Sequence, residues 1–146
     1  MNKIFKLNTP QDSAELATYL APLLKCGDVL CLYGELGAGK TFFAKEIGKA
    51  LGIRDEIDSP SFVLLKEYHT GLLPLYHLDL YRLKTEDELM DLGIFDIIES
   101  GVTLIEWPEL AEKLLPYKTL SLRFVYDGQQ RHVEISGEPR FTDHLD

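Results

Sequence analysis

Eight consecutive residues near the start of the chain carry a pattern that binds phosphate groups. Residues 34–41 read GELGAGKT, which satisfies G-x-x-x-x-G-K-[ST]. The glycines allow backbone amides to converge on phosphate oxygens, and the following helix adds the positive end of its dipole. In this pattern Lys40 brings a mobile positive charge to the β- and γ-phosphates, and the Thr41 hydroxyl is placed to ligate Mg²⁺. The motif therefore predicts a nucleoside triphosphate site.

A site of this kind also needs an acidic group near the magnesium ion, usually at the end of an apolar strand. Two residues qualify, because Asp79 follows the run 75–78 and Glu106 follows the apolar run 102–105. Ligands in open α/β sheets bind at the carboxyl ends of the strands, so we expect both acids at the site. Either one could hold the ion while the other orients water, and the sequence leaves that division open.

The elements that position the phosphate loop can be predicted from the apolar pattern. A buried strand is expected over 29–33, directly before the loop, and a helix over about 41–51, directly after it. An earlier helix begins at Thr9 as N-cap, with proline at its first position, and ends near Gly27.

The rest of the chain predicts a sheet that mixes parallel and antiparallel strands. Further strands are expected over 62–68, 75–81 and 102–105, and a hairpin over 119–126 and 131–136; short helices are expected after Thr85 and over 94–100. The turn at Thr70-Gly71 makes strands 62–68 and 75–81 antiparallel. Within 75–81, His77, Asp79 and Tyr81 are expected to share one face. Residues 53–61 are predicted to be a loop.

Composition favours one globular domain over residues 1–146, with a polar, flexible tail at 137–146. The 146 residues are 45% hydrophobic, which suffices for one core. The net charge of −9 and the lack of a Lys/Arg cluster argue against autonomous nucleic-acid binding. The cysteines, Cys26 and Cys31, fit neither a disulfide framework nor a metal spacing. With no signal-peptide pattern and no membrane-spanning run, a cytoplasmic protein is expected.

Four segments taken together resemble one known family. They are residues 34–41, Ser59-Pro60-Ser61-Phe62, His77-Leu78-Asp79-Leu80-Tyr81-Arg82 and Leu104-Ile105-Glu106-Trp107-Pro108-Glu109. In this order they closely resemble the bacterial TsaE family, over roughly residues 8 to 136. The resemblance implies a small P-loop ATPase with a three-layer α/β fold and a mixed sheet. It also implies that the protein works with TsaB and TsaD in the threonylcarbamoyl modification of adenosine 37 in transfer RNA, and that it hydrolyses ATP weakly alone.

The resemblance also implies roles for individual residues. Catalysis would involve Lys40, Asp79 and Glu106, and magnesium would be held by Thr41, Asp79 and Glu106. ATP would contact Thr9, Gly34, Glu35, Leu36, Gly37, Ala38, Gly39, Lys40, Thr41, Phe42, Ser61, Trp107 and Arg131. The family commonly has threonine where this chain has Ser61, so the hydroxyl is retained. Ser59 to Phe62 would form a switch-like segment near the γ-phosphate.

Other nucleotide chemistries share the phosphate loop. A GTPase should show D-x-x-G and N-K-x-D after the loop, and neither pattern occurs. A small-molecule kinase is the serious alternative, but kinases usually need a lid that bears arginines, and no arginine lies between Arg82 and Arg123. A nucleotide-dependent binding module completed by a partner is a third reading. Outside the motif, His77 could be a packed strand residue, Trp107 could cover core, and Arg82 could form a surface ion pair.

Overall fold

A sheet of seven strands runs through the computed structural model, which describes residues 3–35, 39–57, 64–115 and 120–143. The strands are β1 (Lys3–Lys6), β2 (Val29–Tyr33), β3 (Leu65–Tyr68), β4 (Leu75–Asp79), β5 (Val102–Glu106), β6 (Leu120–Tyr126) and β7 (Arg131–Gly137). Their order is β1-β7-β6-β2-β5-β4-β3. The central strands β6, β2, β5 and β4 are parallel, whereas β1, β7 and β3 are antiparallel to their neighbours. The predicted mixed sheet is confirmed.

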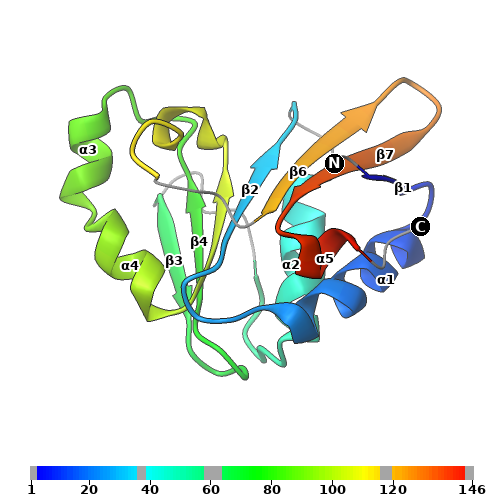
Figure 1. The fold of residues 1–146 in the computed structure, drawn as a ribbon, viewed down its shortest axis with the longest axis horizontal. Coiled ribbons are helices and arrows are strands. Elements are labelled where there is room, and N and C mark those ends of the chain that lie inside the picture. Colours follow the sequence, from blue (N-terminus) through cyan, green and yellow to red (C-terminus); the bar gives the residue numbers. More distant parts are fainter. Residues whose placement is uncertain (1–2, 36–38, 58–63, 116–119, 144–146) are drawn as a thin grey trace.

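Helices cover both faces of this sheet, so the fold has three layers (Figure 1). The helical segments are α1 (Pro10–Leu20), η1 (Ala21–Leu23), α2 (Lys40–Ala50), α3 (Glu86–Asp91), α4 (Ile94–Ser100), η2 (Pro108–Ala111) and α5 (Pro139–Thr142). Helices α1, α2 and α5 pack on one face, and α3, α4 and η2 pack on the other. The expected three-layer α/β architecture is therefore confirmed.

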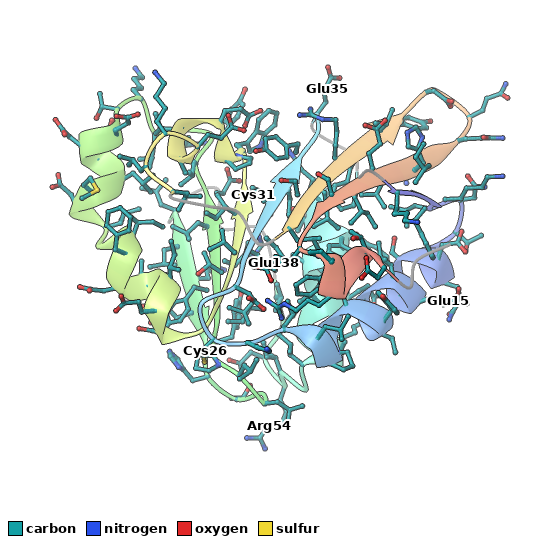
Figure 2. The ribbon with its side chains drawn as sticks, in the orientation of Figure 1. Glu15, Cys26, Cys31, Glu35, Arg54 and Glu138 are labelled. Atoms are coloured by element: carbon teal, nitrogen blue, oxygen red, sulfur yellow. The ribbon has the colours of Figure 1, made fainter. Side chains whose placement is uncertain are left out.

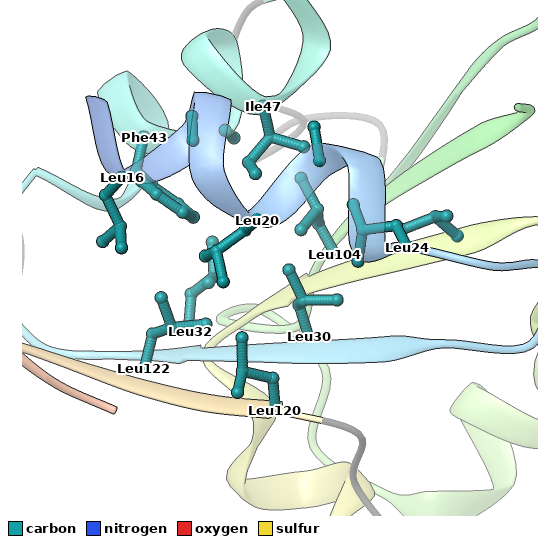
Figure 3. Packing of buried hydrophobic residues seen from close by; sticks show 14 of the residues in the cluster. Leu16, Leu20, Leu24, Leu30, Leu32, Phe43, Ile47, Leu104, Leu120 and Leu122 are labelled. Atoms are coloured by element: carbon teal, nitrogen blue, oxygen red, sulfur yellow. The ribbon is translucent and has the colours of Figure 1, made fainter. Parts of the chain in front are cut away.

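The larger core lies between the sheet and the pair α1 and α2. Leu16 and Leu20 of α1 meet Phe43 and Ile47 of α2 above the central strands, with Leu30 at the centre (Figure 3). Full burial of one such side chain contributes roughly 1.5–3 kcal/mol. Alternate residues of β2 enter the smaller core on the other face, so this strand is buried on both sides, as its continuous apolar run predicts. Strand β2, which directly precedes the phosphate loop, is therefore fixed by packing on both of its faces.

Capping boxes fix the starts of α1 and α3 where the sequence predicts them. The Thr9 hydroxyl accepts from the Asp12 N–H at 3.3 Å, and the Asp12 carboxylate accepts from the Thr9 N–H at 3.0 Å. Thr85 and Glu88 make the same reciprocal pair. The cap at Thr9 matters for the site, because it sets the point where the chain leaves β1 and enters α1.

Two terminal segments differ from the sequence prediction. The sequence pattern does not predict strand β1, whose four residues alternate in burial and pair with β7 at the edge of the sheet. The flexible tail expected from Gly137 is wrong over 137–143, where α5 buries Phe141 completely and Arg140 binds the Asp28 carboxylate and the Leu23 carbonyl. The polar composition of this segment does not predict that its one phenylalanine, Phe141, packs in the core. Residues 144–146 lie outside the described part.

Both cysteines lie within the described residues. Cys26 is exposed, Cys31 is buried in β2, and both are free thiols that lie apart in Figure 2. Within the described ranges, every helix is too short or too polar to cross a bilayer.

Candidate active site

The described ends of the phosphate loop have the backbone geometry that glycine permits. Gly34 follows β2 with φ of 138°, and Gly39 caps the N-terminus of α2 with φ of 107°. Side-chain-bearing residues rarely adopt these angles, so glycine is needed at both positions. Leu36, Gly37 and Ala38 lie outside the described residues. The strand–loop–helix unit is the one that the motif predicts.

Lys40 is the first residue of α2 and is only 4% exposed. Its ammonium group donates to the Gly34 carbonyl and lies 3.6 Å from the centroid of the Trp107 ring. Burial lowers the pKa of Lys40, while the negative charges of Glu106, Asp79 and Glu109 oppose that lowering. The lysine is therefore held between the Gly34 carbonyl and the Trp107 ring, in an acidic surrounding.

Thr41 and Glu106 form the next contact. Glu106 ends β5 and is 3% exposed, and the Thr41 hydroxyl lies 3.3 Å from each of its carboxylate oxygens. His77 lies on the other side of the carboxylate, with its Nε2 2.6 Å from the Oε2 of Glu106. Thr41 and Glu106, two of the magnesium ligands that the sequence analysis predicts, are therefore in contact in the structure.

Asp79 ends β4 and pairs with Glu106 in the parallel register. Its Oδ1 accepts the Tyr81 N–H at 3.0 Å, and the Leu80 N–H donates to the Glu106 carbonyl, also at 3.0 Å. Burial raises the pKa of Asp79, and the charge of Glu106 adds to this effect against the Tyr81 hydrogen bond. Both candidate acids therefore stand at the same edge of the sheet.

Trp107 turns the chain directly after β5. Its φ of 55° and ψ of 58° place it in the left-handed region, which is uncommon for a residue other than glycine and costs on the order of 1 kcal/mol or more. This turn sets the indole beside Lys40 and 4.9 Å from the Tyr81 ring, centroid to centroid. The half-buried ring lies beside Lys40 and belongs to neither hydrophobic core.

A cavity of about 450 Å³ opens beside these groups. It is lined by Leu7, Asn8, Thr9, Pro10, Ser13, Gly39, Lys40, Thr41, Phe42, Glu106 and Arg131. The volume lies in the range of small-molecule sites. The start of α1 and the start of α2 thus form opposite parts of one pocket, which joins residues far apart in the sequence.

The structure brings most of the predicted residues together. Seven of them line the cavity: Thr9, Gly39, Lys40, Thr41, Phe42, Glu106 and Arg131. Asp79 does not line it but is paired with Glu106, and Trp107 does not line it but contacts Lys40. Glu35 does not line it and projects from the edge of the molecule in Figure 2. Ser61 falls outside the described residues. Sequence reasoning missed Leu7, Asn8 and Ser13, since the signal for them is the pairing of β1 with β7.

The oxygen donors of this site suit magnesium. Thr41, Glu106 and Asp79 offer one hydroxyl and two carboxylates, and Mg²⁺ usually takes few protein ligands besides water and phosphate oxygens. In the part of the chain that the structure describes, no group of three or more His, Cys, Asp or Glu side chains forms a metal cluster. One hydroxyl and two carboxylates are oxygen donors of the kind that Mg²⁺ binds.

Comparison with known proteins adds the family. A family model described as "Threonylcarbamoyl adenosine biosynthesis protein TsaE" matches residues 7–133. The chain belongs to the TsaE family. The tRNA threonylcarbamoyladenosine biosynthesis protein TsaE of Bacillus subtilis is 46% identical over 114 residues, covering 77% of this chain and 71% of the relative. The TsaE protein of Rickettsia bellii is 38% identical over 134 residues, covering 90% and 93%.

A solved structure supports the same placement. The crystal structure of Bacillus subtilis YdiB superposes with a TM-score of 0.80 at 32% sequence identity, covering 97% of this chain and 89% of that one. This structure confirms the mixed α/β fold, and the family model and the relatives confirm the TsaE family. The family's part in tRNA threonylcarbamoyladenosine biosynthesis gives the site a biological setting.

Proposed function

We propose that this TsaE-family protein is a magnesium-dependent ATPase that acts with the TsaB–TsaD complex in the threonylcarbamoyl modification of adenosine 37 in tRNA. The observation that carries the proposal is the meeting of Lys40, Thr41 and Glu106 beside one cavity, at the end of a phosphate-loop motif. A buried lysine, a hydroxyl and a carboxylate in this arrangement match the needs of a bound nucleoside triphosphate.

ATP binding would use the backbone of residues 34–41 together with the cavity. Lys40 would leave the Gly34 carbonyl and bind the β- and γ-phosphates, because a phosphate oxygen is a stronger partner for an ammonium group than a neutral carbonyl. The remainder of the nucleotide would lie between Thr9, Phe42 and Arg131. Thr9 and Arg131 support this placement because both line the same cavity although they are far apart in the sequence.

Hydrolysis would depend on the two carboxylates at the sheet edge. Thr41 and Glu106 would hold the magnesium ion, whose charge would help to neutralise the phosphate oxygens. Asp79 stands beside Glu106 and would hold a water ligand of the ion or the attacking water. Lys40 would stabilise the charge that develops on the transferred phosphoryl group.

The nucleotide would act as a switch for the partner proteins. Loop 53–61 and the carboxylate pair would change arrangement between the ATP and ADP states, and hydrolysis would reset the TsaB–TsaD complex. The acidic surface of α3 and α4, with Asp87, Glu88 and Asp91 exposed, does not favour direct tRNA binding. Contact with tRNA would be made through the complex, in the cytoplasm.

The deciding experiment measures phosphate release by the chain alone and with purified TsaB and TsaD. We expect slow release alone and faster release with the complex. A parallel assay follows the γ-label, since transfer to a small acceptor in place of water would establish the kinase alternative. Absence of nucleotide binding by calorimetry, with and without the partners, would refute the proposal.

A further inference from the structure

His77 lies in the middle of β4 and is completely buried. Its Nε2 lies 2.6 Å from the Oε2 of Glu106, a short separation for a side-chain hydrogen bond. A carboxylate in its ionised form can only accept, and this contact then requires the imidazole proton on Nε2. The proposed roles of Lys40, Thr41 and Asp79 leave this histidine unused.

The parallel register explains how the two residues meet. Asp79 is opposite Glu106, and His77 is opposite Leu104, so His77 and Glu106 occupy diagonal positions on the same face of neighbouring strands. The other ring nitrogen, Nδ1, has no hydrogen-bond partner among the described residues. Burying a polar ring costs stability unless it is hydrogen-bonded, and the strong bond of this ring goes to Glu106.

This bond restricts the carboxylate. Glu106 has Oε2 bound to His77, while the Thr41 hydroxyl lies 3.3 Å from both oxygens. Both carboxylate oxygens therefore lie within reach of the Thr41 hydroxyl, and only Oε2 also contacts the imidazole. Hydrogen bonds behind a ligating carboxylate orient it, and their loss typically costs about 10- to 100-fold in metal affinity or activity.

We propose that His77 is a positioning residue that fixes the Glu106 carboxylate for the divalent cation held beside Thr41. The inference rests on the proposed function, because the cation is the one that accompanies the nucleotide. His77 touches neither nucleotide nor ion and acts only through Glu106. A histidine kept for packing alone would be replaceable by an apolar ring of similar size.

Three substitutions separate positioning from packing. His77→Phe keeps an aromatic ring but removes the donor. His77→Gln places an amide N–H close to the position of Nε2, whereas the shorter His77→Asn places its amide near the position of Nδ1. The matched control is His69→Asn, at an exposed histidine that follows β3 and whose ring nitrogen lies 3.4 Å from Glu67.

The main measurement is the Mg²⁺ concentration that half-saturates tight binding of a non-hydrolysable ATP analogue, followed by calorimetry. We expect this midpoint to rise about 10- to 100-fold in the Phe and Asn variants and to stay near wild type in the Gln and His69 variants. A wild-type midpoint in the Phe or Asn variant overturns the inference. Wild-type protein that binds no nucleotide, alone or with TsaB and TsaD, overturns the proposed function instead.

A second measurement needs neither ion nor nucleotide. Nitrogen-15 spectra of the ligand-free wild-type chain report which ring nitrogen of His77 carries the proton. We expect the proton on Nε2, with a resonance that shifts in Glu106→Gln. A proton on Nδ1 alone, or a resonance that Glu106→Gln leaves unmoved, overturns the inference. The position of the proton in the wild-type chain can be measured even if the substituted chains fail to fold.

Discussion

Asp79 and Glu106 are directly opposite each other in the parallel register of β4 and β5, so two carboxylates stand side by side at one edge of the sheet. Asp79 is 4% exposed and Glu106 is 3% exposed. Burial is the main cause that raises the pKa of Asp79, and the neighbouring negative charge adds to it. The folded chain therefore holds the Asp79 proton more tightly than the unfolded chain does.

The raised pKa of Asp79 predicts how stability depends on pH. A carboxyl group whose folded pKa is raised favours folding below its unfolded pKa of about 3.9, and this contribution is lost as pH rises through the folded value. Asparagine does not ionise, so Asp79→Asn removes the loss of stability that ionisation of Asp79 causes as pH rises. We expect the stability of the variant relative to wild type to increase as pH rises above about 3.9, measured by urea unfolding with a chelator present. A constant difference across this range would contradict the burial argument.

Separate substitution of the two acids should divide their roles. Because Glu106 contacts Thr41 and Asp79 does not, Glu106→Gln is expected to raise the magnesium midpoint of nucleotide binding by about tenfold or more. Asp79→Asn should shift that midpoint less and should lower turnover at saturating magnesium, on the order of 100-fold. Magnesium titrations of binding and of phosphate release give both quantities. If Asp79→Asn had the larger effect on the magnesium midpoint and Glu106→Gln the larger effect on turnover, the roles of the two acids would be reversed.

Trp107 offers a direct optical test of the lysine, because it is the sole tryptophan in the chain. The Lys40 ammonium lies 3.6 Å from its ring centroid, so movement of the lysine to a phosphate group should change the indole emission. Mg-ATP is expected to produce a saturable change in wild type. Lys40→Ala should abolish that change and reduce turnover on the order of 100-fold or more, with the circular dichroism spectrum retained. Unaltered turnover in this variant would remove Lys40 from the site.

The sequence predicts the phosphate-loop unit well because its signals are local. The apolar run of β2, the glycines at 34 and 39 and the cap at Thr9 each determine the backbone around themselves. The two acids could also be predicted, since each directly follows an apolar run and parallel strands end at the same sheet edge.

The remaining features depend on contacts between distant segments. The cavity exists because β1 pairs with β7 and brings Thr9 close to α2, and no local pattern encodes that register. The contact of His77 with Glu106 likewise requires the order β4-β5 and its register. Alternation along 75–81 predicts the shared face of His77 and Asp79, but it does not predict the partner on the neighbouring strand.

The end of the chain gives a test of packing that is separate from the chemistry. Phe141 of α5 is fully buried in the larger core, and the Tyr19 hydroxyl donates to its carbonyl at 3.1 Å. Phe141→Ala should therefore lower the free energy of unfolding by about 3–5 kcal/mol. The matched control is Phe95→Ala on α4, where the ring is 42% exposed and the loss should be far smaller. Equal losses in urea unfolding would mean that α5 does not pack on the sheet.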